Sequence, residues 1–259
     1  MAFSLAGKSI LITGASSGFG AAAARAFAAQ KCKLLLGARR VDRLKSVAAE
    51  ARQAGAVDAQ VHALDVATTA SVEAFVQWAR TKTKVVDVLI NNAGGAHGQD
   101  TVATGKDEDW ETMLQTNVLG ILRMVRAVLP LMPKDAGSSI VNIGSVAGRF
   151  AYEGGAAYCA AKAGELKITQ VLRLELNGTG IRISSLDPGM ARTEFSNVRF
   201  KGDTARADKV YEGVHPLLPE DIAETLVWIA SRPPHVNIDE MVIKPVDQAA
   251  TFKVFRRTK

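Results

Sequence analysis

The segment KSILITGASSGFG, residues 8–20, decides the expected fold of this chain. It opens with a short apolar run, Lys8–Thr13, that is typical of a buried β-strand. Glycines follow at positions 14, 18 and 20, and then an alanine-rich helix is expected to about Gln30. Glycines let a backbone approach a phosphate, and a helix N-terminus attracts anions. The segment therefore predicts a phosphate-binding cradle, although its spacing departs from G-x-G-x-x-G and a simple tight turn would also fit.

The end of the next apolar run indicates which nucleotide the cradle would take. This run, Lys33–Ala38, is expected to be the second strand, and Arg39 and Arg40 follow it directly. Folds that bind NAD place an acidic residue roughly 20 residues beyond the glycines, where it bonds the ribose hydroxyls. Two arginines suit a ribose 2′-phosphate instead. We therefore expect NADP, the alternative being that both arginines are ordinary solvated charges.

Apolar runs and amphipathic segments alternate along the rest of the chain, without an internal repeat or a linker. Further strands are expected at Val57–Leu64, Val85–Ile90, Ile140–Ile143, Ile181–Leu186 and Asp239–Lys244. Further helices are expected at Val41–Ala54, Ser71–Thr83, Asp107–Met132, Tyr158–Leu176 and Pro219–Ser231. This alternation predicts a single α/β domain over residues 1–259, with a doubly wound parallel sheet covered on both faces. Its ligand crevice should lie beyond the carboxyl ends of the strands.

The stretch NIGSVAGRFAYEGGAAYCAAKAGE, residues 142–165, supplies candidate catalytic groups at such a strand end. Ser145 follows the strand, and Tyr158 and Lys162 lie four positions apart, on one helical face. A free phenol has a pKa of about 10, and a nearby ammonium favours its ionised form. Tyr158 can then act as general acid or base while Ser145 holds a substrate oxygen. Taken alone, Tyr-x-x-x-Lys is a weak motif that ordinary surface residues also produce.

Two other features bear on a substrate site. Asn117 lies in an apolar helix, where an Asn is disfavoured unless its amide bonds a neighbouring carbonyl or holds a water, and both explanations stay open. Residues 190–215 form a long polar excursion with little apolar periodicity, which predicts a substrate loop or lid. Arg192 and Arg199 in this loop, and Arg149 after Ser145, are candidates to bind a substrate carboxylate.

Composition narrows the class of protein. The 259 residues carry a formal net charge of +6, part of it in a basic tail at residues 246–259 that we interpret as a solvated terminus rather than a nucleic-acid site. The two cysteines have neither disulfide nor metal-ligand spacing, so no metal is expected. The first residues lack the pattern of a signal peptide, and no apolar run reaches membrane-spanning length. We therefore expect a cytoplasmic protein without a membrane partner.

The motifs occur in the order of a known family. They are Thr13-Gly14-x-x-x-Gly18-x-Gly20, Asn91-Asn92-Ala93-Gly94, Asn117, Ser145, Tyr158-x-x-x-Lys162 and Pro188-Gly189. Over essentially its whole length the chain resembles the short-chain dehydrogenase/reductase family. The resemblance implies a Rossmann-like sheet of about seven parallel strands. It also implies a homotetramer built on the helices Asp107–Met132 and Tyr158–Leu176.

The resemblance further implies a role for each motif. Tyr158 would be the catalytic acid/base, Lys162 would lower its pKa and hold the nicotinamide ribose, and Ser145 would polarise the substrate carbonyl. Asn117 would keep a water in the proton path, Asp65 would approach the adenine and Asn91 the adenosine ribose. The implied NADP-binding residues are Gly14, Ser16, Ser17, Gly18, Phe19, Gly20, Arg39, Arg40, Asp65, Val66, Asn91, Ala93, Gly94, Tyr158, Lys162, Pro188, Gly189 and Thr193.

A narrower likeness lies in Thr193–Asp203 and in Lys244–Gln248 with the tail. These segments are similar to NADP-dependent 3-hydroxy acid dehydrogenases, which oxidise serine, allo-threonine and acids such as 3-hydroxyisobutyrate. The segment 189–193 is shorter than that group implies, and Arg192 has no match there. The alternatives are an NADPH-dependent carbonyl reductase or ketoreductase acting on an aldehyde, ketone or acyl thioester, and a non-catalytic NADP-binding protein.

Overall fold

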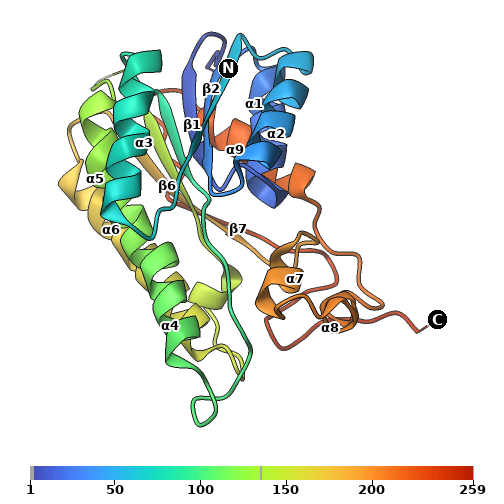
Figure 1. Ribbon diagram of the computed structural model, residues 1–259. Coiled ribbons are helices and arrows are strands. Elements are labelled where there is room, and N and C mark those ends of the chain that lie inside the picture. Colours follow the sequence, from blue (N-terminus) through green and yellow to red (C-terminus); the bar gives the residue numbers. More distant parts are fainter. Residues whose placement is uncertain (1–2, 135, 259) are drawn as a thin grey trace.

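A single parallel sheet organises the chain in the computed structural model, which describes residues 3–134 and 136–258 (Figure 1). Its seven strands lie in the order β3-β2-β1-β4-β5-β6-β7, and every neighbouring pair is parallel. The strands are β1 Ser9–Thr13, β2 Lys33–Ala38, β3 Asp58–Ala63, β4 Val88–Asn91, β5 Ser139–Ile143, β6 Arg182–Pro188 and β7 Glu240–Ile243. The predicted fold class is confirmed. The strand order reverses between β1 and β4, where folds of this type bind their ligands.

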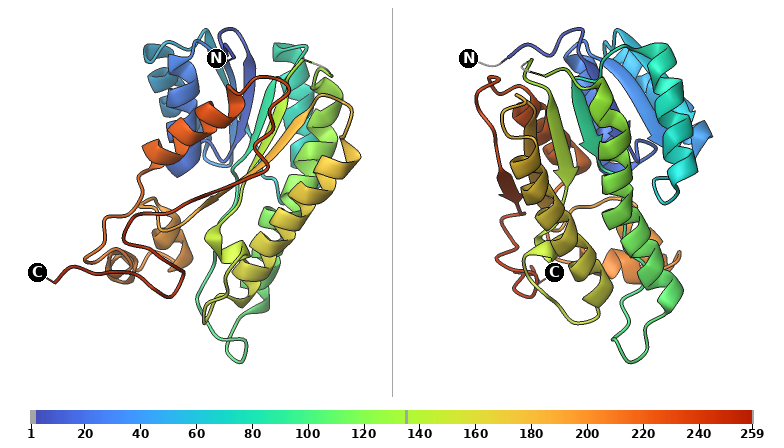
Figure 2. Two further views of the ribbon diagram at one scale, coloured as in Figure 1. Left: turned by 180° about the vertical axis from the view of Figure 1, so that it is seen from behind. Right: turned by 90° about the vertical axis from the view of Figure 1, so that its left-hand side faces the viewer.

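Helices cover both faces of the sheet (Figures 1 and 2). One layer consists of α1 Gly18–Ala29, α2 Val41–Gln53 and α9 Pro219–Ala230. The other consists of α3 Thr69–Lys82, α5 Gly120–Val128 and α6 Ala156–Glu175, with α4 Asp107–Leu114 extending past the end of the sheet. Each layer buries its own apolar cluster against the strands, which is why the strands are apolar on both sides.

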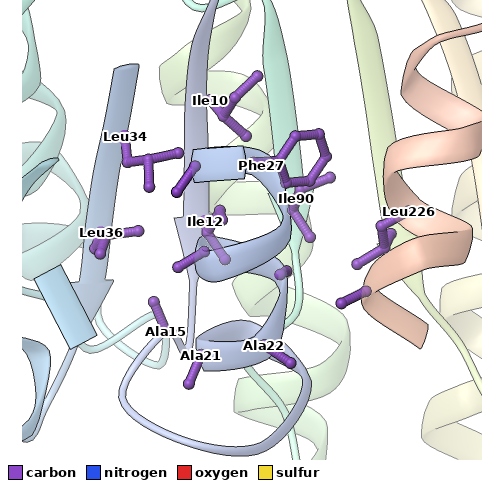
Figure 3. Close-up of a cluster of buried hydrophobic side chains, with 14 of the residues drawn as sticks. Ile10, Ile12, Ala15, Ala21, Ala22, Phe27, Leu34, Leu36, Ile90 and Leu226 are labelled. Atoms are coloured by element: carbon purple, nitrogen blue, oxygen red, sulfur yellow. The ribbon is translucent and has the colours of Figure 1, made fainter. Parts of the chain in front are cut away.

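The alanines of α1 let this helix lie close to the sheet (Figure 3). Ala21 and Ala22 are buried, and Phe27 packs in the same cluster as Ile10 and Ile90 with none of its surface exposed. Burying a side chain of this size stabilises the fold by about 1.5–3 kcal/mol. This packing fixes the start of α1, and with it the glycine loop, against the end of β1.

The helix expected over Asp107–Met132 is interrupted. Between α4 and α5 lies a π-helical turn, η1 Gln115–Leu119, and a 3₁₀ turn, η2 Leu129–Leu131, follows α5. Asn117 lies in the π turn, where its Nδ2 donates to the carbonyls of Met113 at 2.8 Å and Gly95 at 2.9 Å. The amide thus ties the helix to the loop after β4. Turns of this kind inside helices are frequent at functional sites.

The polar excursion at 190–215 contains two short helices that its sequence did not predict, α7 Phe195–Arg199 and α8 Thr204–Lys209. It lies beyond the carboxyl end of the sheet, and the C-terminal tail runs against it (Figure 1). Arg257 N donates to Gly213 O at 2.8 Å and so holds the tail against the excursion, while Phe255 N donates to Asp247 O at 2.8 Å within the tail. It therefore packs on its own chain.

Across residues 3–134 and 136–258, no helix has the length and apolar character needed to cross a membrane.

Candidate active site

A cavity of about 660 Å³ runs along the carboxyl ends of the strands. The glycine loop after β1, the arginines after β2 and Asp65 after β3 line one end. Ser145, Tyr158 and Lys162 line the other. The sheet therefore brings both predicted sites into one continuous space.

The glycine loop has its shape because a side chain would not fit. Gly14 has a φ of +66°, and a Cβ on it would lie 2.8 Å from Asn92 Nδ2. That amide donates to Thr13 O at 2.9 Å and so holds the loop against the end of β4. Gly20 does not line the cavity but supports the loop, since its Cβ would lie 2.5 Å from Gly14 O. The loop's own backbone thus faces the cavity, as a phosphate cradle requires.

Positive charge gathers at the end of β2. Arg40 donates to the hydroxyls of Ser17 at 2.6 Å and Ser16 at 3.3 Å. Its Nη1 also donates to Glu194 Oε2 at 2.8 Å, and Arg43 donates to Glu194 Oε1 at 2.6 Å. The hydrogen bond from Arg40 is the largest cause that lowers the pKa of Glu194. Two arginines on one carboxylate show that this corner of the structure attracts anions.

The acid/base end is built on β5 and α6. Ser145 is the N-cap of the short turn η3 Val146–Gly148, where its Oγ accepts from Ala147 N at 3.1 Å. The same hydroxyl also acts to lower the pKa of Tyr158. Lys162 lies one turn after Tyr158 and donates from Nζ to Ile143 O at 2.7 Å. The three groups are thus brought together as their spacing predicts.

The charge balance at Tyr158 differs from the sequence-based expectation. Burial raises the pKa of Tyr158, and this outweighs Lys162 and the Ser145 hydroxyl, which lower it. Burial acts to lower the pKa of Lys162, but the neighbouring Glu165 carboxylate and Tyr158 raise it overall. Lys162 therefore stays charged and favours the tyrosinate, yet burial of the phenol keeps the pKa of Tyr158 above its usual range.

Two predicted residues lie behind the cavity rather than in its wall. Asn91 is buried, and its Nδ2 donates to Asn142 Oδ1 at 2.8 Å, whereas Asn92, Ala93 and Gly94 line the cavity. Asn117 is also buried and does not line the cavity. Its bonds to Gly95 and Met113 match the carbonyl-bonding explanation of an Asn in this helix.

The structure distinguishes the three arginines that are candidates to bind a substrate carboxylate. Arg149 does not line the cavity, because its guanidinium pairs with Asp187 and Glu240. Arg192 is exposed and stacks on Tyr211, with 5.2 Å from its guanidinium carbon to the ring centre. Arg199 lines the cavity, and its Nη2 is buried without a partner in the described part of the chain. Of these three, Arg199 alone lines the cavity.

Several residues that line the cavity were not among the predicted site residues. From the substrate loop and tail these include Glu194, Phe195, Tyr211, Thr251, Val254 and Arg256. Glu165 does not line the cavity, but its Oε2 accepts from Lys162 Nζ at 2.7 Å. Its place three positions after Lys162 was the available clue, since residues at that spacing meet on a helix.

The residues that line the cavity suit a dinucleotide with an additional phosphate, such as NADP. The cavity joins the glycine loop, the Arg39–Arg40 corner and the Tyr158–Lys162 pair. Behind it, the buried Asn91 Oδ1 has no hydrogen-bond partner among the described residues. Within the two described ranges there is no group of three or more side chains suited to a metal ion.

Comparison with known proteins agrees with this geometry. Residues 8–203 match the family model described as short chain dehydrogenase. A relative from Schizosaccharomyces pombe, named NADP-dependent 3-hydroxy acid dehydrogenase, is 42% identical over 98% of each chain. A relative from Agrobacterium fabrum, named serine 3-dehydrogenase, is 39% identical over 96% of this chain and 98% of its own length. A solved structure described as the closed form of serine dehydrogenase complexed with NADP⁺ has a TM-score of 0.88 and 38% identity, and covers 96% of this chain and all of its own.

Proposed function

This chain belongs to the short chain dehydrogenase family, and from that premise we propose that it uses NADP to oxidise the 3-hydroxyl of small 3-hydroxy acids. Candidate substrates are L-serine, L-allo-threonine and 3-hydroxyisobutyrate. The observation that carries the proposal is the single cavity that joins the Arg39–Arg40 corner to Ser145, Tyr158 and Lys162. The names of the relatives described above support it.

The residues that would hold NADP follow from the cavity wall. The backbone of the glycine loop, with Ser16 and Ser17, would receive the pyrophosphate, and Arg39 and Arg40 would receive the 2′-phosphate. Asp65 and Val66 line the same end and would border the adenine. Lys162 would hold the nicotinamide ribose. Pro188, Gly189 and Thr193 also line the cavity and would border the nicotinamide.

The chemistry at Tyr158 is proton transfer. When bound, NADP supplies the hydride acceptor. Ser145 would hold the substrate oxygen with its hydroxyl, and Tyr158 would take the proton that this oxygen releases. The charge of Lys162 favours the tyrosinate that accepts it. Asn117 is a positioning residue in this scheme, because its amide fixes the loop at Gly95.

Arg199 is the proposed partner of the substrate carboxylate. Its guanidinium carbon lies 5.3 Å from the ring centre of Tyr152 and 6.0 Å from that of Tyr158. Its Nε donates to Gly98 O at 3.0 Å, which fixes the guanidinium, while Nη2 has no hydrogen-bond partner within residues 3–134 and 136–258. A cation this close to the phenol suits an acid whose carboxylate and carbinol are separated by a single carbon. Residues 190–215 would then act as the substrate loop, with residues 246–258 of the tail as its support; the last residue of the predicted tail lies outside the described residues.

The assembly and location follow the family resemblance. The exposed apolar residues Leu114, Leu119, Leu122, Val171 and Leu174 lie on α4, η1, α5 and α6. We propose that these residues pack against other subunits in a homotetramer, and that the enzyme is cytoplasmic. The molar mass from light scattering during size-exclusion chromatography tests the proposed tetramer.

The deciding experiment measures initial rates of NADPH formation with each of these acids and with 3-hydroxypropionate, in parallel with NAD. Turnover that needs NADP and a 3-hydroxy acid would support the proposal. Turnover confined to aldehydes, ketones or acyl thioesters would replace it with the reductase alternative. NADP binding without any hydride transfer would leave a non-catalytic NADP-binding protein.

A further inference from the structure

Glu165 is a buried carboxylate that the mechanism above does not use. It lies on α6, none of its surface is exposed, and it faces Lys162 rather than solvent. Its Oε2 accepts from Lys162 Nζ at 2.7 Å, while Oε1 has no partner among the residues that the structure describes. A half-satisfied buried carboxylate costs free energy, and the surrounding contacts must offset that cost.

Glu165 and Ile143 together fix the position of Lys162. An ammonium has three hydrogens, and two of them are engaged by Ile143 O and Glu165 Oε2, each at 2.7 Å. Since Lys162 also lines the cavity, one hydrogen remains for a bound group. Without Glu165, the lysine would keep a single acceptor and could turn about its flexible stem.

The turn of α6 that carries Glu165 is held from behind by a chain of buried hydrogen bonds. Thr169 Oγ1 donates to the Glu165 carbonyl at 3.0 Å, and Asn142 Nδ2 donates to Thr169 Oγ1 at 2.8 Å. Asn91 Nδ2 then donates to Asn142 Oδ1 at 2.8 Å. The backbone of α6 at Glu165 is therefore tied to β5 and β4.

Charges from several elements act on this carboxyl group. Burial raises the pKa of Glu165 to about 7, Lys162 lowers it and Asp187 at the end of β6 raises it. Asp187 is itself paired with Arg149, which follows η3. Glu165 in turn is one of the groups that raise the pKa of Tyr158. Its charge thus changes near neutral pH and acts on the proposed acid/base.

We propose that Glu165 is a positioning residue that holds Lys162 in place and sets how readily the Tyr158–Lys162 pair gives up its first proton. The inference rests on the proposed role of Tyr158. With Glu165 ionised, loss of that proton leaves a net negative charge in the buried cluster. With a neutral residue at position 165, loss of the same proton leaves the cluster with no net charge. The proton therefore leaves more readily.

The test compares wild-type enzyme with Glu165→Gln, which keeps size and hydrogen bonding but removes the charge. Tyrosinate absorbance of the protein without added substrate reports the phenols, and Tyr158→Phe identifies the Tyr158 contribution. We expect the Tyr158 ionisation, and the pH dependence of kcat/KM, to move to lower pH by about one unit in Glu165→Gln. Glu165→Asp should restore most of the wild-type profile, since it keeps the charge.

Glu175→Gln is the matched control, because Glu175 lies on the same helix but is exposed. It should leave both profiles unchanged. A folded Glu165→Gln enzyme with an unaltered tyrosinate titration and an unaltered pH profile would overturn the proposal, even if its melting temperature fell. The tyrosinate titration does not depend on the substrate. Failure of every hydroxy acid would therefore overturn the proposed function and still leave this inference tested.

Discussion

The two ends of the cavity hold their charges in different surroundings. At the acid/base end, Tyr158, Lys162 and Glu165 are at most 9% exposed. At the arginine end, the side chains of Arg40 and Glu194 are 43% and 42% exposed, and Arg43 is 52% exposed. A charge acts more strongly in a low-dielectric interior than at a surface that water and salt screen. Substitutions at the buried end should therefore change rates by large factors, and those at the exposed end should tune binding.

The largest expected effect is at Tyr158. Tyr158→Phe removes the proton acceptor, and turnover with NADP and a 3-hydroxy acid should fall by about a hundredfold to ten-thousandfold. Isothermal titration calorimetry should still detect NADP binding, because the rest of the cavity wall is unchanged. Retained turnover in this variant would remove Tyr158 from its proposed role.

A smaller effect is expected at Arg40. Arg40→Ala should weaken NADP binding roughly 10- to 100-fold through loss of a hydrogen bond to a charged group, and should leave NAD binding nearly unchanged. Dissociation constants for both cofactors measure this. Arg43→Ala is the matched control, since Arg43 shares the bond to Glu194 but does not line the cavity. Equal loss of NADP and NAD affinity in Arg40→Ala would count against a 2′-phosphate site.

The buried end should also affect stability as a function of pH. The pKa of Glu165 is raised by burial from 4.5 to about 7, so the folded protein binds this proton more tightly than the unfolded chain. The free energy of unfolding should therefore fall as pH rises through that window, by up to about 3 kcal/mol. Urea unfolding at several pH values should show this decline in wild type and a smaller one in Glu165→Gln. An identical decline in both proteins would mean that other titratable groups cause the loss of stability.

The smallest expected effect is at Glu194, whose carboxylate occupies Arg40 and Arg43. Glu194→Gln should strengthen NADP binding severalfold, the scale of an exposed ion pair, and should leave NAD binding unchanged. Added salt should reduce the difference between wild type and variant. If both cofactors gain affinity equally, the effect belongs to the loop rather than to competition for the arginines.

Local patterns predicted much of the fold and several residues that line the cavity. The apolar run at residues 8–13, the glycines after it and the four-residue spacing of Tyr158 and Lys162 each act over a few residues, so the sequence carries them directly. The π turn at Asn117 was not predictable, because it depends on bonds to Gly95, which lies 22 residues away. Nor could the sequence separate Arg199 from Arg149, since the difference is the ion pairs that Arg149 makes with Asp187 and Glu240.

The sequence by itself determined the order of strands and helices along the chain and the two arginines at the end of β2. It also determined that Ser145, Tyr158 and Lys162 lie at one strand end. These follow from periodicity and spacing along the chain. The tertiary structure alone decided that Glu194 reaches Arg40 across 154 residues, that the tail lies against the substrate loop, and that burial raises the pKa of Tyr158 despite Lys162. Contacts between distant segments and the loss of solvent arise only when the chain packs, and both set the charges of this site.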